Sequence, residues 1–317
     1  MTIQDLKENV LSGKDITKEE ALFLADSDAE EVCMAANDIR LQLCGNDFDM
    51  CGVISGKSGR CSENCRYCSQ SSCSTYPVEA HPLLNTEEIL EHARLRDSQG
   101  VRHYCIVSVG RQMQNKELER LCDTIRILRK ETGLMLCTSL GLLSEHQFSL
   151  LKEAGVVRIH NNLETSRRYF PHICTSHTYD DKLATLHAAK RAGLELCCGG
   201  IIGLGETMED RIDMALDLRG LTPASVPINI LDPVPGTPLE HMQHLEDELV
   251  RKIIAIYRFI LPKAYIRLAA GRDYLSDTGI TCFRSGSNAA ITGDMLTVKG
   301  ITVERDLQAI QNLGYKL

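Results

Sequence analysis

Residues 103–140, HYCIVSVGRQMQNKELERLCDTIRILRKETGLMLCTSL, predict one strand–helix–strand unit and decide the fold class. The apolar runs at 103–109 and 134–140 are typical of buried strands. Between them, residues 116–131 place apolar side chains three and four positions apart, as on the inner face of a helix. A helix between two buried strands predicts a right-handed crossover, and therefore a parallel sheet covered by helices.

The same alternation continues along most of the chain. Further strands are predicted at 156–162, 194–202, 225–231 and 265–270, and further helices at 87–99, 145–154, 180–192, 209–219 and 247–261. A strand that recurs about every 30 residues with a helix in each gap indicates seven or eight such units. We therefore predict an α/β protein in which residues 46–317 form a (β/α)8 TIM-type barrel. The active site of such a barrel lies at the carboxyl ends of the strands.

Residues 1–45 predict an N-terminal helical extension that precedes the barrel. Two segments in it, TKEE at 17–20 and SDAE at 27–30, have the pattern of a capping box. Each segment precedes a stretch with helical apolar spacing, so each is expected to start a helix.

The composition limits the classes of function. The chain is 43% hydrophobic and 25% charged, which is ordinary for a globular protein, and its net charge of −8 without a Lys/Arg run disfavours nucleic acid as a partner. The first residues lack the basic start and apolar stretch of a secretion signal, and no segment approaches the ~18 apolar residues of a membrane span. We therefore expect a cytoplasmic protein with no membrane partner. In that reducing compartment, 14 cysteines indicate metal ligands, redox groups or buried small side chains rather than disulfides.

Cys61, Cys65 and Cys68 are spaced C-x3-C-x2-C in a Gly- and Ser-rich loop after the expected first strand. Thiolates bind iron–sulfur clusters and zinc, and so short a run can reach a single metal centre. Three protein ligands would leave one iron of a [4Fe-4S] cubane open to an exogenous group. A zinc site is the alternative, with Cys73 or His81 as fourth ligand, although zinc ligands are usually paired in two separated knuckles.

This spacing, with an aromatic residue before the last cysteine, resembles the signature of the radical S-adenosylmethionine (SAM) superfamily. The resemblance implies that Cys61, Cys65 and Cys68 hold a [4Fe-4S] cluster whose open iron binds SAM. It also implies that Tyr67 borders the adenine ring.

Residues 199–206, GGIIGLGE, end the fifth predicted strand. Taken alone, the stretch is typical of a tight turn with no ligand, although glycine also permits close approach of a ligand to the backbone. Beside the three cysteines it resembles the G-x-I-x-G-x-x-E stretch of the radical SAM superfamily, with Glu206 in register. That resemblance implies that Gly199, Ile201 and Gly203 pack against the adenosyl group.

Cys105, Cys137 and Cys197 lie on three different predicted strands, at an equivalent depth before the carboxyl end of each. In a barrel such residues can converge inside, although strand cysteines are more often small buried hydrophobic residues. Arg267 lies midway along a fourth apolar strand. Because burying an unpaired guanidinium costs several kcal/mol, Arg267 requires an anionic partner within the barrel.

Three cysteines and one arginine in these positions resemble the auxiliary-cluster ligands of the biotin synthase family, and the resemblance extends from about residue 46 to residue 313. It implies that Cys105, Cys137, Cys197 and Arg267 hold an auxiliary [2Fe-2S] cluster that supplies sulfur.

The same resemblance assigns the remaining binding residues. Asn162 and Asn229 would hold the ureido ring of dethiobiotin, Glu164 the ribose of SAM, and Lys182 its methionyl carboxylate. Glu164 and Lys182 stand where well-known members of the family have Asp and Arg. Lysine retains the charge but not the bidentate geometry of arginine.

Cys198 is a further departure, because it replaces a serine directly after Cys197. Adjacent strand residues face opposite sides, so Cys198 is expected to point away from the cluster. With so many cysteines, a larger four-iron auxiliary cluster with an extra sulfide is an alternative to [2Fe-2S]. No role is assigned to four other cysteines: Cys51, Cys73, Cys174 and Cys282.

The resemblance implies a radical SAM sulfurtransferase that inserts sulfur between C6 and C9 of dethiobiotin to form biotin. Saturated carbons have no acidic proton and no leaving group, so the cofactors and not side chains must carry the chemistry. The expected partners are an electron donor such as flavodoxin or ferredoxin, and a second copy of the chain in a homodimer. Two alternatives remain. One is another radical SAM enzyme, such as a hydrogenase-cofactor maturase or a methylornithine-type mutase, and the other is a non-catalytic metal-binding scaffold.

Overall fold

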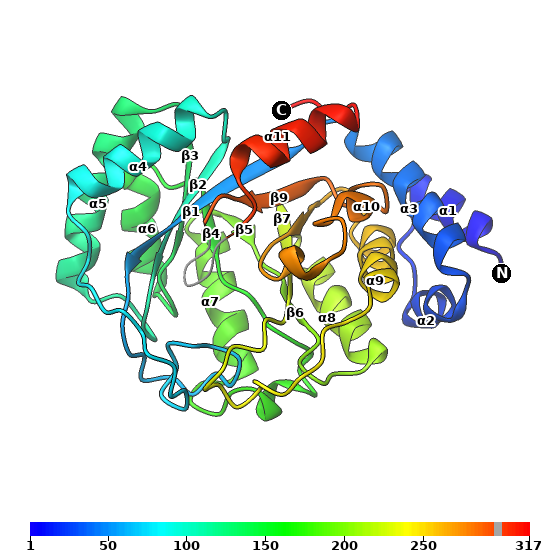
Figure 1. Cartoon of the computed structure of the whole chain (residues 1–317), viewed down its shortest axis with the longest axis horizontal. Coiled ribbons are helices and arrows are strands. Elements are labelled where there is room, and N and C mark those ends of the chain that lie inside the picture. The colour runs from blue at the N-terminus through cyan, green and yellow to red at the C-terminus, as the bar shows by residue number, and fades with distance from the viewer. Residues whose placement is uncertain (295–299) are drawn as a thin grey trace.

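The unit at residues 103–140 forms β2 (His103–Ser108), α5 (Asn115–Glu131) and β3 (Met135–Ser139) in the computed structural model. The structure describes residues 1–294 and 300–317. Strands β2 and β3 pair in parallel, with Cys105 opposite Cys137. The predicted crossover is confirmed, and its helix lies outside the sheet (Figure 1).

The other strands extend this pair into a closed barrel. They are β1 (Asp49–Lys57), β4 (Arg158–His160), β5 (Glu195–Cys197), β6 (Gly200–Ile202), β7 (Ser225–Ile230), β8 (Tyr265–Leu268) and β9 (Ala289–Thr292). Their order is β5-β4-β3-β2-β1-β9-β8-β7-β6, and β5 also pairs in parallel with β7, which closes the sheet. Since β5 and β6 are two parts of one strand interrupted at residues 198–199, the barrel has eight strand positions. The predicted (β/α)8 fold is confirmed.

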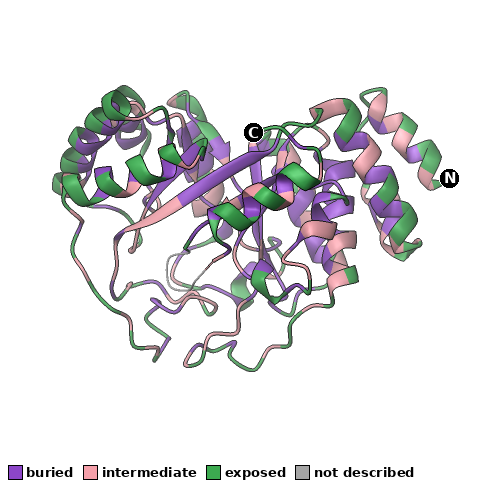
Figure 2. Cartoon of the chain, turned by 45° about the horizontal axis from the view of Figure 1, so that its top comes forward, coloured by how far each residue is buried: buried purple, intermediate pink, exposed green. Residues whose placement is uncertain are grey.

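Helices cover the outside of this barrel (Figure 1). Besides α5 they are α4 (Thr86–Ser98), α6 (Glu145–Ala154), α7 (Tyr179–Arg191), α8 (Met208–Leu221), α9 (Asp247–Ile260) and α11 (Val303–Asn312). Shorter helical turns lie at η1 (Phe170–His172), η2 (Arg272–Tyr274) and α10 (Ile280–Phe283). Figure 2 shows buried residues along the strands and exposed residues on the outer faces of the helices. Among the described residues, no helix is long and apolar enough to cross a bilayer.

The amino-terminal residues form α1 (Ile3–Leu11), α2 (Lys18–Asp26) and α3 (Ala29–Cys44). Helix α3 packs along α9, and α2 packs against α8 and α9 (Figure 1). Helix α9 is therefore covered on two sides, by the barrel and by α3, and buries residues over most of its circumference. The division between an extension and a barrel domain at residue 45 stays a prediction.

One of the two predicted capping boxes is confirmed. Thr17 Oγ1 accepts a hydrogen bond from the backbone of Glu20, whose carboxylate accepts one from Thr17 N–H. The second is wrong, because Asp28 rather than Ser27 caps α3. The Ser27 hydroxyl donates instead to the carbonyl oxygen of Phe23 in the preceding helix, so it is engaged at the end of α2.

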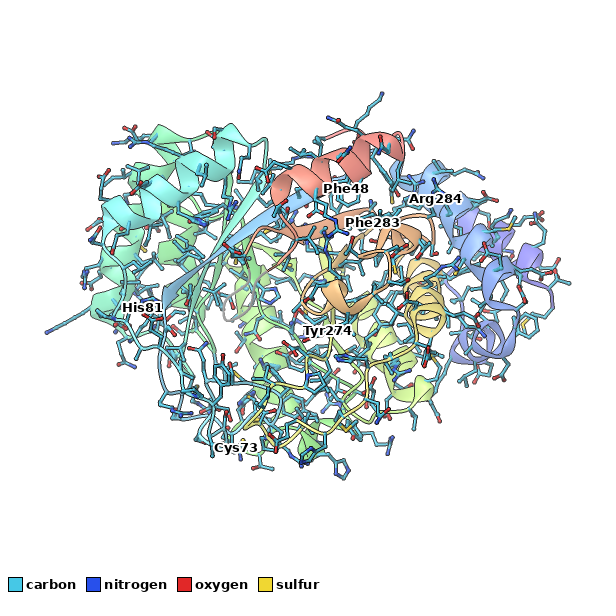
Figure 3. All side chains as sticks on the ribbon, viewed as in Figure 1. Phe48, Cys73, His81, Tyr274, Phe283 and Arg284 are labelled. Atoms are coloured by element: carbon cyan, nitrogen blue, oxygen red, sulfur yellow. The ribbon has the colours of Figure 1, made fainter. Side chains whose placement is uncertain are left out.

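Strand β9, which lies outside the predicted strands, joins β1 to β8 and completes the barrel. Next to it, the rings of Phe48 and Phe283 pack edge to face with centroids 4.9 Å apart (Figure 3). Tyr315 packs on Phe48 at 5.1 Å. These aromatic contacts attach the carboxyl-terminal segment to the start of β1.

Candidate active site

A cavity of about 320 Å³ extends from the barrel interior, where His103 and Arg158 line it, to the carboxyl ends of the strands, where the fold class predicts the active site. Ten of the predicted site residues line it: Tyr67, Cys68, Cys105, Cys137, Asn162, Glu164, Cys197, Ile201, Asn229 and Arg267. Five others are not part of its lining: Cys61, Cys65, Lys182, Gly199 and Gly203. The structure therefore gathers residues from most barrel strands around one space.

The three cysteines of the C-x3-C-x2-C spacing lie in the loop after β1, as predicted. Backbone hydrogen bonds shape this loop: Cys61 N–H donates to the Gln70 carbonyl at 2.8 Å, and Cys68 N–H to the Cys65 carbonyl at 3.2 Å. In Figure 3 this loop lies at the lower edge of the molecule, where Cys73 is labelled. Local backbone hydrogen bonds thus stabilise the loop that carries the three cysteines.

Tyr67 and Ile201 form an apolar part of the cavity wall beside this loop. They belong to a small cluster with Leu204 and Leu231, apart from the main core. Burial, reinforced by the Glu164 carboxylate, raises the pKa of the Tyr67 phenol well above its ordinary value. A neutral aromatic ring in an apolar wall suits a planar ring such as adenine.

Gly199 and Gly203, the two glycines predicted to pack against the adenosyl group, are required by the packing and conformation of the backbone. A Cβ at Gly199 would lie 1.9 Å from the carbonyl oxygen of Pro227, so a side chain has no room between β5 and β7. Gly203 has φ +94°, and its N–H donates to Glu206 Oε1 at 2.9 Å. These contacts explain the glycine-rich pattern through close strand packing and a positive φ.

Glu164 has an unusual backbone conformation, with φ +71°. A non-glycine residue in this region is uncommon and is often found at functional sites. Its backbone bridges to Gly200, and its carboxylate lies 3.9 Å from Lys182 Nζ. Lys182 also donates to Asn161 Oδ1 at 3.1 Å.

The two asparagines predicted to bind substrate are held by backbone groups. Asn162 Oδ1 accepts from Gly199 N–H at 3.0 Å. Asn229 Nδ2 donates to the Gly200 carbonyl at 3.1 Å, and its Oδ1 accepts from Ala270 N–H at 3.2 Å. These bonds fix both side chains where they line the cavity.

A second group of thiols lines the same cavity. Cys105 and Cys137 are neighbours across β2 and β3, and Cys197 ends β5. Cys51 of β1, to which the sequence assigned no role, packs with Cys105 and Cys137 and completes a group of four thiols from four strands. Cys198 is fully buried in the main core and outside the cavity lining, as the alternation of strand residues predicts.

Arg267 has the anionic partner that its burial requires. Its Nη2 donates to Asp49 Oδ2 at 2.5 Å, and its Nη1 donates to the backbone carbonyls of Asp49 and Ala290. Its Nε donates to Ser225 Oγ at 3.1 Å. The required anion is confirmed, and it is a carboxylate of β1 that sequence reasoning missed.

Asp49 also contacts two other side chains beside the thiols, His103 and Arg158. His103 Nδ1 lies 2.7 Å from its Oδ1, and Arg158 Nη1 lies 3.6 Å from its Oδ2. Burial alone would raise the pKa of Asp49, but Arg267, then His103 and Arg158, hold it well below its usual range. The carboxylate is therefore charged at neutral pH.

These cations also affect the nearest thiol. Burial alone would raise the pKa of Cys197, but the hydrogen bond with His160 Nδ1 at 3.5 Å, and then Arg267 and Arg158, lower it to about 7. Burial raises the pKa of the other three strand thiols. Since metals bind thiolates, a positive surrounding favours the ligating form of this group.

Two family models match the chain. The radical SAM superfamily matches residues 57–218, and the biotin and thiamin synthesis associated domain matches residues 227–316. Together with the barrel and the three-cysteine loop at its strand ends, these matches define the chain as a radical SAM enzyme. That class implies a [4Fe-4S] cluster and SAM as cofactors.

Relatives that match the chain over its full length show which family of radical SAM enzymes it belongs to. The chain is 49% identical over 317 residues to biotin synthase of Brachyspira hyodysenteriae, covering 100% of this chain and 95% of that protein. It is 50% identical over 315 residues to biotin synthase 2 of Corynebacterium diphtheriae, covering 99% and 96%. The chain belongs to the biotin synthase family.

Solved structures share the fold at lower identity. Methylornithine synthase (PylB) superposes with a TM-score of 0.84 at 20% identity, covering 98% of this chain and 96% of that one. The hydrogenase maturase HydG superposes with a TM-score of 0.83 at 18% identity, covering 99% and 74%. At these identities the likeness shows the barrel fold alone, so it does not favour either of those activities for this chain.

Proposed function

We propose that this chain inserts sulfur between C6 and C9 of dethiobiotin to form biotin. One observation carries the proposal: Cys68 of the cluster loop and four strand cysteines line a single cavity. A group that abstracts hydrogen and a group that supplies sulfur must both reach one bound substrate, and a shared cavity provides that proximity.

The donor set of the loop fits a [4Fe-4S] cluster. Cys61, Cys65 and Cys68 present three soft thiolate ligands within eight residues, and three ligands leave one iron open for SAM. Bound there, the cluster and SAM supply a hydrogen-atom abstractor strong enough for a saturated carbon.

The side chains around the cavity position the two organic molecules. Tyr67 and Ile201 provide the apolar surface for adenine, and Glu164 accepts hydrogen bonds from the ribose hydroxyls. Lys182 pairs with the methionyl carboxylate, and residues 199–203 bring the strand backbone close to the adenosyl group. The proposal for Glu164 is supported by its positive φ at the cavity wall.

Asn162 and Asn229 bind the ureido ring of dethiobiotin in this proposal. Each amide is already oriented by a backbone hydrogen bond, so little rotamer entropy is lost when the substrate binds. The apolar side chains that complete the lining, such as Val53 and Val107, exclude water from a reaction between radicals and sulfur.

We further propose that Cys51 joins Cys105, Cys137 and Cys197 as a ligand of the auxiliary cluster, which supplies the sulfur atom. Four thiols complete the ligand set of either a [2Fe-2S] or a four-iron cluster, because both take four cysteine ligands. Arg267 donates four hydrogen bonds to protein groups, and a protonated guanidinium has no lone pair for iron. Its proposed role is therefore to balance the charge of the thiolates.

The reaction also needs electrons from outside the chain. We propose a small electron-transfer protein such as flavodoxin or ferredoxin as the donor, in the cytoplasm where such proteins are reduced. A homodimer stays a prediction from the family resemblance.

Anaerobic reconstitution with iron and sulfide tests the function. With SAM, dethiobiotin and a reductant, the wild type should form biotin, and Cys65→Ala should lose formation of 5′-deoxyadenosine. Cys51→Ser should retain 5′-deoxyadenosine but lose auxiliary iron, whereas the matched control Cys198→Ser should bind as much iron as the wild type. Zinc without acid-labile sulfide in the wild type would reject the proposal in favour of a metal-binding scaffold.

A further inference from the structure

A buried thiol that the proposed reaction does not use lies against one of the cluster cysteines. Cys174 Sγ is 3.7 Å from Cys65 Sγ, and only 4% of Cys174 is exposed. We propose that Cys174 donates a hydrogen bond to the iron-bound sulfur of Cys65 and so raises the reduction potential of the [4Fe-4S] cluster. The inference rests on the proposed function, because it takes Cys65 as a cluster ligand.

The contact is built by a dense set of hydrogen bonds between two segments. Asn64, which precedes Cys65, accepts from the backbone N–H groups of Thr175 and Ser176 at 3.0 Å each. Its own backbone N–H donates to Ser176 Oγ at 3.1 Å, and its Nδ2 donates to Thr175 Oγ1 at 2.6 Å. The segment that carries Cys174 is therefore held in register with the cluster loop.

His177 and Glu63 determine where the protons of this network go. His177 Nδ1 lies 2.6 Å from Glu63 Oε2 and 3.3 Å from Cys174 Sγ. A ring nitrogen carries one hydrogen, and the carboxylate is the closer and stronger acceptor. With its hydrogen directed to Glu63, Nδ1 offers no lone pair to the thiol of Cys174.

Two other neighbours of the Cys174 thiol are also occupied. Asn64 Oδ1, at 3.4 Å, already accepts two backbone hydrogen bonds, and Ser176 Oγ, at 3.4 Å, accepts from Asn64 N–H. Ser176 directs its own hydrogen to Glu63 at 2.8 Å. Two acceptors remain, His177 Nε2 at 3.8 Å and Cys65 Sγ at 3.7 Å. The sulfur of Cys65 is the closer of the two, and as a metal ligand it carries negative charge.

The sign of the effect follows from charge. A cysteine that ligates iron has no hydrogen, so Cys174 must be the donor of the pair. A hydrogen bond to a cluster sulfur stabilises the reduced, more negative state over the oxidised one. Cys174 is thus a positioning residue that makes the cluster easier to reduce, with His177 and Glu63 orienting it.

The test is a redox titration of the reconstituted full chain, following the electron paramagnetic resonance signal that changes when SAM is added. Cys174→Ala should lower the equilibrium constant for reduction about fivefold, the effect expected for one net hydrogen bond. Cys174→Ser keeps a donor and should restore most of the wild-type value. Cys122→Ala is the matched control, because Cys122 is also 4% exposed but lies in α5, outside the cavity lining, and it should leave the potential unchanged.

A second measurement detects the hydrogen of the bond directly. In D2O, the wild-type cluster should couple to an exchangeable deuteron in electron–nuclear double resonance, and that coupling should disappear in Cys174→Ala. A potential equal to that of the wild type in Cys174→Ala, or the absence of this coupling, would overturn the inference. A loss of iron in Cys174→Ala would also overturn it, since Cys174 would then be a ligand. A wild type without a four-iron cluster would instead refute the proposed function.

Discussion

Replacing Asp49 by asparagine tests whether the buried carboxylate stabilises the barrel beside the auxiliary thiols. The substitution retains the shape of the side chain and removes its charge. Asp49 is fully buried, and the side chains of Arg267 and Arg158 are only 2% and 6% exposed. Asparagine would leave both guanidinium groups without this buried counter-charge.

The magnitude follows from the distances. Opposite charges 4 Å apart attract by about 4 kcal/mol at an effective dielectric constant of about 20. Asp49 has one guanidinium nitrogen at 2.5 Å and another at 3.6 Å, and the recovered desolvation of the carboxylate offsets part of this attraction. Removing one partner of such a buried pair costs about 3–5 kcal/mol, which is the expected loss in the free energy of unfolding.

The assay is urea unfolding of the metal-free chain at neutral pH, followed by circular dichroism. Glu195→Gln is the matched control, because Glu195 also pairs with Arg158, at 2.9 Å, but its side chain is 56% exposed. This surface pair should contribute about 1 kcal/mol or less. If the two variants lost equal stability, the reasoning about the buried carboxylate would be refuted.

The pH dependence gives an independent check. The pKa of Asp49 is lowered in the folded state, so its stabilisation is fully present above the ordinary carboxyl pKa of about 3.9. It is lost as the pH falls from there through the folded-state pKa. The stability difference between wild type and Asp49→Asn should therefore stay constant near neutral pH and narrow below about pH 4.

Two other predictions concern the cavity wall. Gly199→Ala places a Cβ 1.9 Å from the Pro227 carbonyl oxygen and should cost about 3 kcal/mol or more in urea unfolding, whereas Gly220→Ala, whose Cβ meets nothing within 4 Å, should stabilise α8 by up to about 1 kcal/mol. Equal effects of the two would contradict the close approach of β5 and β7. Lys182→Met should weaken SAM binding about 10- to 100-fold in equilibrium dialysis, the loss of one charged hydrogen bond, and Lys182→Arg should retain most of the affinity. Weakened dethiobiotin binding in Lys182→Met would indicate a structural role instead.

Local patterns in the sequence were sufficient to predict the (β/α)8 barrel. The period of apolar residues located β2, β3 and the surrounding helices, because a strand or helix of a barrel buries one side or both along its whole length. Strand β9 was not predicted, because its four residues Ala289–Thr292 include two alanines and one threonine and so do not form an apolar run typical of a strand. The second capping box failed for a similar reason, because Ser27 and Asp28 are both good caps and a contact of Ser27 with the preceding helix decides between them.

What the sequence by itself determined was the chemistry that depends on short spacing. Cys61, Cys65 and Cys68 lie within eight residues, so a single loop must bring them together whatever the rest of the chain does. The family resemblance also rests on such motifs.

Only the tertiary structure decided which distant groups meet. Asp49 and Arg267 are 218 positions apart, and Cys65 and Cys174 are 109 apart, so no local pattern signals either contact. The same holds for Cys51, whose place in the cavity depends on the register of β1 against β2. Barrel closure turns inward the residues of strands that are remote in sequence, and only then do charges and thiols acquire their partners.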